Sequence, residues 1–388
     1  MSRGIDPCKT LVIEGLIRMK RSKQLERNAV AGQLGEIGLI ERILSKFSEP
    51  GSAKLIVGPG DDAAAIEFEG KARVLVTTDM LVEGVHFELE WSYPEALGFK
   101  SVAANLSDLA AMGGRAVGIV VSLGIPPMVP VRAVDKMYRG MSRALSLFGG
   151  DLLGGDTVRS SAIIVSVSAI GVLVGERPLL RSGARPGDKI CLTGSLGRSE
   201  SGLMLLKRYF RQARRPRKTV LDAWAERTGG YFRKGLPPRL RRNGYACIAK
   251  HLMPSPRMRE ARVLSTFGPS AMIDISDGLS ADLMQVSRAS GVGLVLMEES
   301  IPVDKNARVV AKTFDISPYK IALSSGEEYE LLFTIPDARV KQAASALARR
   351  CGTTIHVIGE ITENRQSVSV VGNRGRIRAL LETGYRHF

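Results

Sequence analysis

The stretch M-I-D-I-S-D-G-L, at residues 272–279, joins a short apolar run to two aspartates and a glycine. It predicts a strand over Met272–Ile275, and the residues after it predict a helix over Leu279–Ser290. The first half of the chain shows the same device, since a predicted strand at Leu55–Val57 runs into the aspartates of 58–62. Strands that alternate with helices in this way predict a mixed α/β fold, with carboxylates gathered at strand ends.

The length and composition of the chain indicate two globular domains. Its 388 residues correspond to about two domains of ordinary size, and 44% hydrophobic with 24% charged residues is typical of a globular protein. Glycine, proline and arginine cluster at 175–187, which predicts the domain boundary. We expect a basic extension over 1–34, an N-terminal domain over 35–175, and a C-terminal domain over 176–388 that carries a basic insert at about 207–245.

Local patterns predict further strands and helices on both sides of this boundary. The expected strands are 73–78, which ends at Asp79, then 117–123, a short strand leading into Asp156, and 162–174, 189–192, 293–297, 331–335 and 356–358. The expected helices are 36–47, 94–112, 131–148, 203–210 and 338–349. The pattern is that of two α/β domains.

The net charge of +16 is concentrated in two segments. The insert at 207–245 holds 13 Lys/Arg against 2 Asp/Glu, and the extension at 1–34 holds 7 against 3, so the remaining chain is nearly neutral. Arginines beside Trp224, Tyr231 and Phe232 could bind RNA. Because charge runs are usually solvated, we favour a solvated, partly mobile surface insert, and nucleic acid is an unlikely but open partner.

Several common classes of protein are excluded by what the sequence lacks. It has no Walker A loop, no protein-kinase motif set and no GxGxxG after a strand, and its four cysteines form no CxxC pair. No apolar run reaches the roughly 18 residues that span a bilayer, and no clear signal-peptide cleavage site follows the short apolar patch near the N-terminus. We therefore expect a cytoplasmic enzyme with no zinc site and no membrane partner.

The residues that stand out are aspartates beside Gly, Thr or Ser. Asp61 and Asp62 lie in a glycine-rich turn, Asp79 follows Thr77 and Thr78, and the others are Asp108, Asp156, Asp274 and Asp277. A single aspartate after a strand is often only a turn former. A whole set that converged would repel strongly unless cations neutralised it, and Mg²⁺ prefers such oxygen ligands. The set therefore predicts magnesium-dependent chemistry on phosphates.

The ordered motifs resemble the thiamine-monophosphate kinase family of the aminoimidazole ribonucleotide synthetase-like superfamily. The resemblance covers about 35 to the end, apart from the 207–245 region. It rests on G-E-I-G-L-I (35–40), G-P-G-D-D-A-A (58–64), T-T-D-M-L-V-E-G-V-H-F (77–87), N-L-S-D-L-A-A-M-G (105–113), G-G-D-T (154–157), R-S-G-A-R-P-G-D (181–188), D-I-S-D-G-L (274–279), S-G-E-E-Y-E-L (325–331) and G-Y-R-H-F (384–388). The 77–87 motif and the aromatic C-terminus point to the thiamine enzymes within the superfamily.

The resemblance implies a two-domain fold of this superfamily, a homodimer formed through the N-terminal sheet, and phosphorylation of thiamine monophosphate by ATP with several Mg²⁺ ions. Positioning and metal electrostatics would carry the reaction, so no catalytic side chain is expected. The implied metal ligands are Asp62, Thr77, Thr78, Asp79, Asp108, Asp156, Asp274 and Asp277. The implied nucleotide contacts are Tyr138, Gly155, Asp156, Arg181 and Ser276, and the implied substrate contacts are His86, Glu327 and Tyr385.

Two alternatives stay open at this point. Another enzyme of the same superfamily would act on a different small acceptor, although Cys8 lacks the glycine-rich setting of a selenophosphate synthetase and the 77–87 motif argues against the ribonucleotide enzyme. An RNA-binding protein that uses the basic insert would leave the aspartates unexplained. Salt-sensitive RNA binding without ATP turnover would favour that second alternative.

Overall fold

The structure is a computed structural model that describes residues 54–58, 60–67, 73–211, 216–364 and 368–385, together with Gly38. Residues Ala53–Tyr385 form one compact unit. The predicted extension at 1–34 and the predicted helix at 36–47 lie outside the described residues, apart from Gly38. The domain bounds stay a prediction, although the described chain contains two separate sheets.

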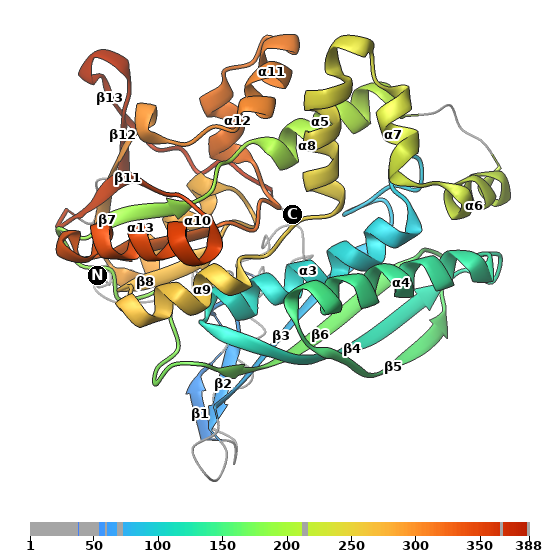
Figure 1. The fold of residues 1–388 in the computed structure, drawn as a ribbon, viewed down its shortest axis with the longest axis horizontal. Coiled ribbons are helices and arrows are strands. Elements are labelled where there is room, and N and C mark those ends of the chain that lie inside the picture. Colours follow the sequence, from blue (N-terminus) through green and yellow to red (C-terminus); the bar gives the residue numbers. More distant parts are fainter. Residues whose placement is uncertain are drawn as a thin grey trace, which may run out of the picture. The chain divides into compact units, whose positions relative to one another are not determined.

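The first sheet takes its strands from the first half of the chain, in the order β1-β2-β3-β6-β4-β5. Its strands are β1 (Lys54–Val57), β2 (Ala64–Glu67), β3 (Arg73–Val82), β4 (Gly114–Ile125), β5 (Asp151–Arg159) and β6 (Ile164–Leu173). Neighbouring strands are antiparallel except for β4 and β5, which are parallel. Strand β5 is last in this order, so it is an edge strand. Two helices, α3 (Pro94–Ala111) and α4 (Val131–Phe148), lie side by side over one face (Figure 1).

The two helices approach each other closely because glycines face each other across the contact. A Cβ atom on Gly98 of α3 would lie 1.9 Å from the Met137 carbonyl oxygen, and one on Gly140 of α4 would lie 1.9 Å from that of Glu95. Real Cβ atoms do not approach backbone so closely, so only glycine fits at either position. The close contact fixes α3, on which part of the site is built.

The second sheet belongs to the second half of the chain and has the order β13-β12-β9-β11-β7-β10-β8. Its strands are β7 (Lys189–Thr193), β8 (Ala271–Asp274), β9 (Gly293–Met297), β10 (Leu331–Ile335), β11 (Ile355–Thr362), β12 (Val368–Val371) and β13 (Ile377–Ala379). The helices of this half are α5 (Arg198–Tyr209), α6 (Arg217–Glu226), α7 (Gly229–Gly235), α8 (Arg241–Leu252), α9 (Met258–Leu264), α10 (Leu279–Ser290), α11 (Lys305–Thr313), α12 (Pro318–Ser324) and α13 (Asp337–Cys351).

Side chains alternate across this second sheet between two cores. Ile190 and Leu192 of β7 pack in a core with α10, whereas Cys191 between them packs in the core that also contains residues of α9, α13 and α3. That second core continues under the first sheet. Helix α3 therefore packs against both sheets, which explains why the described chain forms one compact unit.

Strand β3 corrects one prediction. The sequence suggested that the strand ends at Asp79, but β3 continues to Val82. Its partner β6 pairs with it from Val74 through Val82 without a break, so backbone pairing outweighs the low strand preference of aspartate. Asp79 therefore lies within a strand, where alternation sends neighbouring side chains to opposite faces of the sheet.

The insert at 207–245 also differs from the expected solvated segment. Within its described residues, Leu221, Trp224 and Ala225 of α6 and Phe232 of α7 are buried. Figure 1 shows α5, α7 and α8 gathered in one helical group, with α6 apart from them beside α4. Burial of two of the three aromatic rings leaves Tyr231 as the exposed one, which reduces the stacking surface available to the RNA-binding alternative.

Within the described part of the chain, no helix is long and apolar enough to cross a membrane. The cytoplasmic location stays a prediction.

Candidate active site

Three aspartates from distant parts of the sequence form an acidic cluster. One carboxylate oxygen from each of Asp62, Asp108 and Asp274 lies within 4.8 Å of the other two. Asp62 lies between β1 and β2, Asp108 lies on α3, and Asp274 ends β8, so the cluster joins the two sheets. Among the described residues, the Oδ2 atom of Asp62 is buried without a hydrogen-bond partner.

Burial and mutual repulsion oppose ionisation of this cluster. Burial is the larger cause, and it raises the pKa of Asp62 to about 6 and that of Asp274 to about 8. The pKa of Asp108 lies well above its usual range, because the charge of Asp79 adds to the effect of burial. A cation that holds all three groups ionised would relieve this penalty, and a set of carboxylate oxygens fits a hard cation such as Mg²⁺.

Helix α3 fixes the carboxylates of both sheets through hydrogen bonds. The Thr77 hydroxyl donates to Asp108 Oδ2 at 2.7 Å, and the Asp79 amide donates to Asn105 Oδ1 at 3.1 Å. The Ser107 hydroxyl donates to Asp274 Oδ2 at 2.5 Å. Residues 105, 107 and 108 of one helix thus position groups from β3 and β8.

A second acidic group adjoins this cluster. Burial, followed by the charges of Asp277 and Glu327, raises the pKa of Asp79 to about 6. Asp79 in turn raises the pKa of Asp108, so the two groups are electrostatically continuous. Most of the expected metal ligands share this acidic region: Asp62, Thr77, Asp79, Asp108, Asp274 and Asp277.

Two expected ligands, Thr78 and Asp156, lie on the other face of the first sheet. Thr78 is exposed, and its hydroxyl donates to the Val167 carbonyl. Asp156 is exposed on β5 and pairs with the exposed Ser122 of β4. Strand β5 is three strands from β3, a distance of about 14 Å at ordinary strand spacing. Within one chain, the structure does not bring these two side chains to the acidic cluster.

Arg181 is the counter-ion of the cluster. Its Nη2 and Nε atoms donate to Asp62 Oδ1 at 2.6 and 3.1 Å, and its backbone amide donates to Asp61 Oδ2 at 3.1 Å. Its Nη1 atom donates to Gln285 Oε1 at 2.6 Å, which orients the guanidinium group. The contact of Arg181 with a nucleotide stays a prediction, and its charge lies beside the carboxylates.

Backbone hydrogen bonds join three motif segments around Asp277. The amide of Glu327 donates to the Ser276 carbonyl at 2.7 Å, and that of Tyr385 donates to the Asp277 carbonyl at 3.1 Å. Glu327 and Tyr329 both adopt the left-handed backbone region, with φ of 54° and 50°. Such conformations are uncommon for residues other than glycine, and they cluster at functional sites. The loop before β10 is therefore held in a strained shape beside the acidic region.

Glu327 has two buried partners that the sequence analysis missed. Lys100 Nζ lies 2.5 Å from Glu327 Oε1, and His251 Nδ1 lies 3.2 Å from Oε2. Burial raises the pKa of Glu327, but the charge of Lys100 more than offsets it and lowers the pKa below its usual value. One signal was available in the sequence, since a lysine in the otherwise small and apolar turns of a predicted helix needs an acidic partner.

His86 and Tyr385, both expected substrate contacts, lie near each other. Their ring centroids are 6.4 Å apart with an interplanar angle of 45°. The Val82 amide donates to His86 Nδ1 at 3.0 Å, which leaves Nε2 to carry the proton of the neutral ring. The two rings thus bring the 77–87 motif and the C-terminal motif together.

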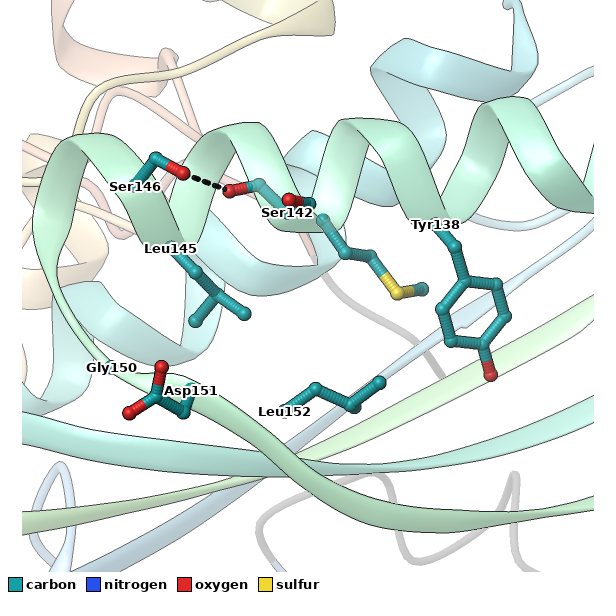
Figure 2. A pocket seen from close by; sticks show the side chains of 8 residues that line it. Tyr138, Ser142, Leu145, Ser146, Gly150, Asp151 and Leu152 are labelled. Atoms are coloured by element: carbon teal, nitrogen blue, oxygen red, sulfur yellow. Dashed lines mark hydrogen bonds between the residues drawn. The ribbon is translucent and has the colours of Figure 1, made fainter.

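Tyr138 lines a hollow of about 430 Å³ between α4 and the start of β5. Figure 2 shows Tyr138 and Leu145 of α4 facing Leu152 of β5, with Asp151 beside them. Burial raises the pKa of Tyr138. The hollow is lined by an aromatic ring, aliphatic side chains and a few hydroxyl groups.

Comparisons with known proteins show which family this chain is similar to. Residues 60–173 match the family described as AIR synthase related protein, N-terminal domain, and residues 185–372 match the corresponding C-terminal domain. The thiamine-monophosphate kinase of Mycobacterium tuberculosis (strain H37Rv) is 36% identical over 301 residues, which cover 77% of this chain and 80% of the relative. The chain belongs to the thiamine-monophosphate kinase family.

Other members of the thiamine-monophosphate kinase family are similar to this chain over most of its length. The Bacillus subtilis enzyme is 32% identical over 336 residues, covering 86% of this chain and 93% of its own. A solved structure described as AaThiL complexed with AMPPCP and TMP superposes with a TM-score of 0.74 at 29% identity, covering 93% of this chain and 99% of its own. The family fold inferred from the sequence is thus confirmed.

Proposed function

We propose that this chain transfers the γ-phosphoryl group of ATP to thiamine monophosphate, giving ADP and thiamine diphosphate. The family membership supports this reaction, and so does the similarity to AaThiL complexed with AMPPCP and TMP. The observation that carries the proposal is the acidic cluster of Asp62, Asp108 and Asp274 where the two sheets meet. A cluster of this kind suits the clamping of polyanionic phosphates through bound cations.

The reaction needs little from the side chains beyond position and charge. A phosphate oxygen of thiamine monophosphate forms a bond to the γ-phosphorus, while the bond to the bridging oxygen breaks and its electron pair leaves with ADP. The attacking oxygen is already ionised near neutral pH, so no general base is required. A site rich in carboxylates suits this chemistry, because bound cations rather than a base would supply the charge stabilisation.

The acidic cluster is the proposed Mg²⁺ site. Asp62, Asp108 and Asp274 would hold the ion, with Thr77, Asp79 and Asp277 close by. When bound, Mg²⁺ neutralises charge on the phosphoryl groups. Thr78 and Asp156, which lie on the other face of the first sheet, are also proposed as Mg²⁺ ligands.

The nucleotide is proposed to contact Tyr138, Gly155, Asp156, Arg181 and Ser276. The hollow beside Tyr138 supports a place for the base, and Arg181 supports contact with phosphates because its charge lies beside the acidic cluster. Gly155 has no room for a side chain, since a Cβ atom there would lie 2.2 Å from the Val121 carbonyl oxygen.

The thiamine moiety is proposed to contact His86, Glu327 and Tyr385. Thiamine carries a cationic thiazolium ring, which favours an ionised carboxylate and aromatic faces. The lowered pKa of Glu327 supports an ionised carboxylate at neutral pH, and the neighbouring rings of His86 and Tyr385 supply aromatic surface.

A homodimer formed through the first sheet is part of the proposal. Edge strand β5 is exposed at every residue, and Leu152, Leu153 and Val158 are each about half exposed. An exposed apolar edge strand invites pairing with another chain. We expect Leu153→Lys to yield monomers in sedimentation velocity at micromolar concentration, whereas Val309→Lys, on an exposed part of α11, should leave the dimer intact. A wild-type monomer would contradict the dimer.

The direct test of the activity is ADP release with ATP, Mg²⁺ and thiamine monophosphate together. We expect turnover only when all three are present. We expect Asp108→Asn to lower kcat about a hundredfold or more, because it removes a carboxylate proposed to hold the Mg²⁺ ion that stabilises charge in the transition state. Asp135→Asn, an exposed carboxylate on α4, is the matched control and should keep full activity. A folded protein that binds Mg²⁺ but does not turn over thiamine monophosphate would exclude this substrate.

A further inference from the structure

Helix α6 of the basic insert begins at Arg217, which forms an ion pair with Glu83 of the 77–87 motif. Arg217 Nη1 donates to Glu83 Oε1 at 2.9 Å, and Nη2 donates to Glu83 Oε2 at 2.8 Å. Two parallel bonds of this kind fix both the distance and the orientation of the two groups. The insert therefore contacts a motif that lies more than a hundred residues earlier in the sequence.

Glu83 is a fixed part of the loop that carries His86. Its side chain is 11% exposed, and its Oε2 atom also accepts a hydrogen bond from the Ile163 amide at 2.9 Å. The loop closes on itself, because the Gly84 amide donates to the Phe87 carbonyl at 2.8 Å and the His86 amide donates to the Val82 carbonyl at 3.0 Å. A displacement of Glu83 would therefore move the backbone that aims His86.

Helix α6 is fixed by buried packing and by hydrogen bonds, so the backbone that carries Arg217 is fixed as well. Trp224 is fully buried, and its Nε1 atom donates to Ser92 Oγ at 3.1 Å. Arg227, which follows the helix, donates to the carbonyls of Leu89 and Ser92. Lys136 of α4 donates to the Ala225 carbonyl at 2.5 Å. The helix is thus bonded to both ends of the segment from Glu83 to Ser92, and it packs against α4, as Figure 1 shows.

We propose that Arg217 is a positioning residue that holds the 82–87 loop in place, so that His86 meets the thiamine moiety of the acceptor. The inference rests on the proposed function, and it gives the basic insert a role in acceptor recognition. An isolated surface ion pair contributes little. Here the pair is bidentate and its carboxylate is almost buried, so within the described part of the chain its loss leaves the Ile163 amide as the hydrogen-bond donor to Glu83.

The experiment compares Arg217→Gln with Lys218→Gln in the full-length chain. Lys218 is the adjacent residue on α6, and its ion pair with Asp222 does not involve the 82–87 loop. We expect Arg217→Gln to raise KM for thiamine monophosphate by roughly five- to tenfold, with kcat and KM for ATP within about twofold of wild type. Lys218→Gln should match wild type. Arg217→Lys should recover part of the loss, because lysine keeps the charge but lacks the fork.

Amide hydrogen exchange without substrates supplies a readout that does not depend on turnover. The amides of Gly84 and His86, both hydrogen-bonded within the loop, should exchange faster in Arg217→Gln than in Lys218→Gln. Unchanged KM and unchanged exchange in Arg217→Gln would overturn the inference, as would an equal rise in KM for both substrates. If wild type fails to turn over thiamine monophosphate, the proposed function falls, and the exchange result still decides whether Arg217 holds the loop.

Discussion

Lys100, which is buried, and Glu327, which is partly buried, form an ion pair whose members come from opposite halves of the chain. Replacing Lys100 with methionine leaves a partly buried carboxylate without its cation, which costs about 1–3 kcal/mol, between the values for exposed and for fully buried pairs. We expect a loss of that order in the free energy of unfolding, together with weaker binding of thiamine monophosphate. Urea unfolding measures the first effect, and isothermal titration calorimetry measures the second.

The double variant Lys100→Met/Glu327→Gln separates charge from packing, because it removes both charges. It should regain part of the stability while staying defective in substrate binding. Lys218→Met, which breaks an exposed pair, serves as the control and should change stability by less than about 0.5 kcal/mol. A double variant no more stable than Lys100→Met would contradict the charge argument.

His251 should make stability depend on pH. Burial, and then the charge of Lys100, lowers the pKa of this histidine to about 3, whereas an unfolded histidine has a pKa of about 6.5. Between these values the unfolded chain binds a proton that the folded chain does not, so this contribution to stability is complete above about pH 6.5 and is lost as the pH falls. His251→Gln should therefore show a shallower decline than wild type between pH 7 and 5 in urea unfolding. Equal slopes would exclude His251 as the cause.

At the scale of elements, α6 tests whether the basic insert is packed or solvated. Trp224 is fully buried and hydrogen-bonded to Ser92, so Trp224→Ala should lower the free energy of unfolding by about 3–5 kcal/mol. Thr219→Ala, on an exposed position of the same helix, should change it by less than about 0.5 kcal/mol. Equal, small effects in both variants would show that the insert does not pack as described.

Some helices could be predicted closely, although α5 begins at Arg198 rather than at residue 203, and α6 to α9, α11 and α12 were not predicted. The predicted helices at 131–148 and 279–290 agree with α4 and α10, since their apolar spacing and flanking glycines or prolines are local signals. The end of β3 was missed because it is set by pairing with β6, which lies far along the chain. The buried face of α6 could have been inferred, since Leu221, Trp224 and Ala225 have helical spacing, but the surrounding charges drew the interpretation to the surface.

At the scale of the whole molecule, the sequence identified the chemistry of the site better than its geometry. Asp62, Asp108 and Asp274 do converge, as the motifs suggested. Residue type could not reveal that Asp156 lies on the opposite face of the first sheet, because that depends on strand order and register. Nor could it reveal that Lys100 neutralises Glu327, because the pair forms only when α3 packs against the second half of the chain.

The acidic cluster makes a prediction that involves both sheets. Asp62 and Asp108 come from the first half of the chain and Asp274 from the second, so a bound Mg²⁺ ion would link the halves. An ion that binds only the folded state stabilises it by about 2.7 kcal/mol at a concentration of 100 Kd, so Mg²⁺ should raise the thermal midpoint by several degrees. Because all three ligands belong to one site, Asp62→Asn and Asp274→Asn should each abolish most of that rise.

Asp274→Asn should behave oppositely without the metal. Near pH 8, removal of one charge relieves the repulsion among the cluster carboxylates, so Asp274→Asn should be at least as stable as wild type in the presence of a chelator. Asp135→Asn should retain the full response to Mg²⁺, because Asp135 is exposed on α4. Differential scanning calorimetry with and without Mg²⁺ measures both effects. If Asp62→Asn abolishes the rise and Asp274→Asn does not, the ion is held by the first sheet alone, and the cluster is not the joint site on which the proposed chemistry depends.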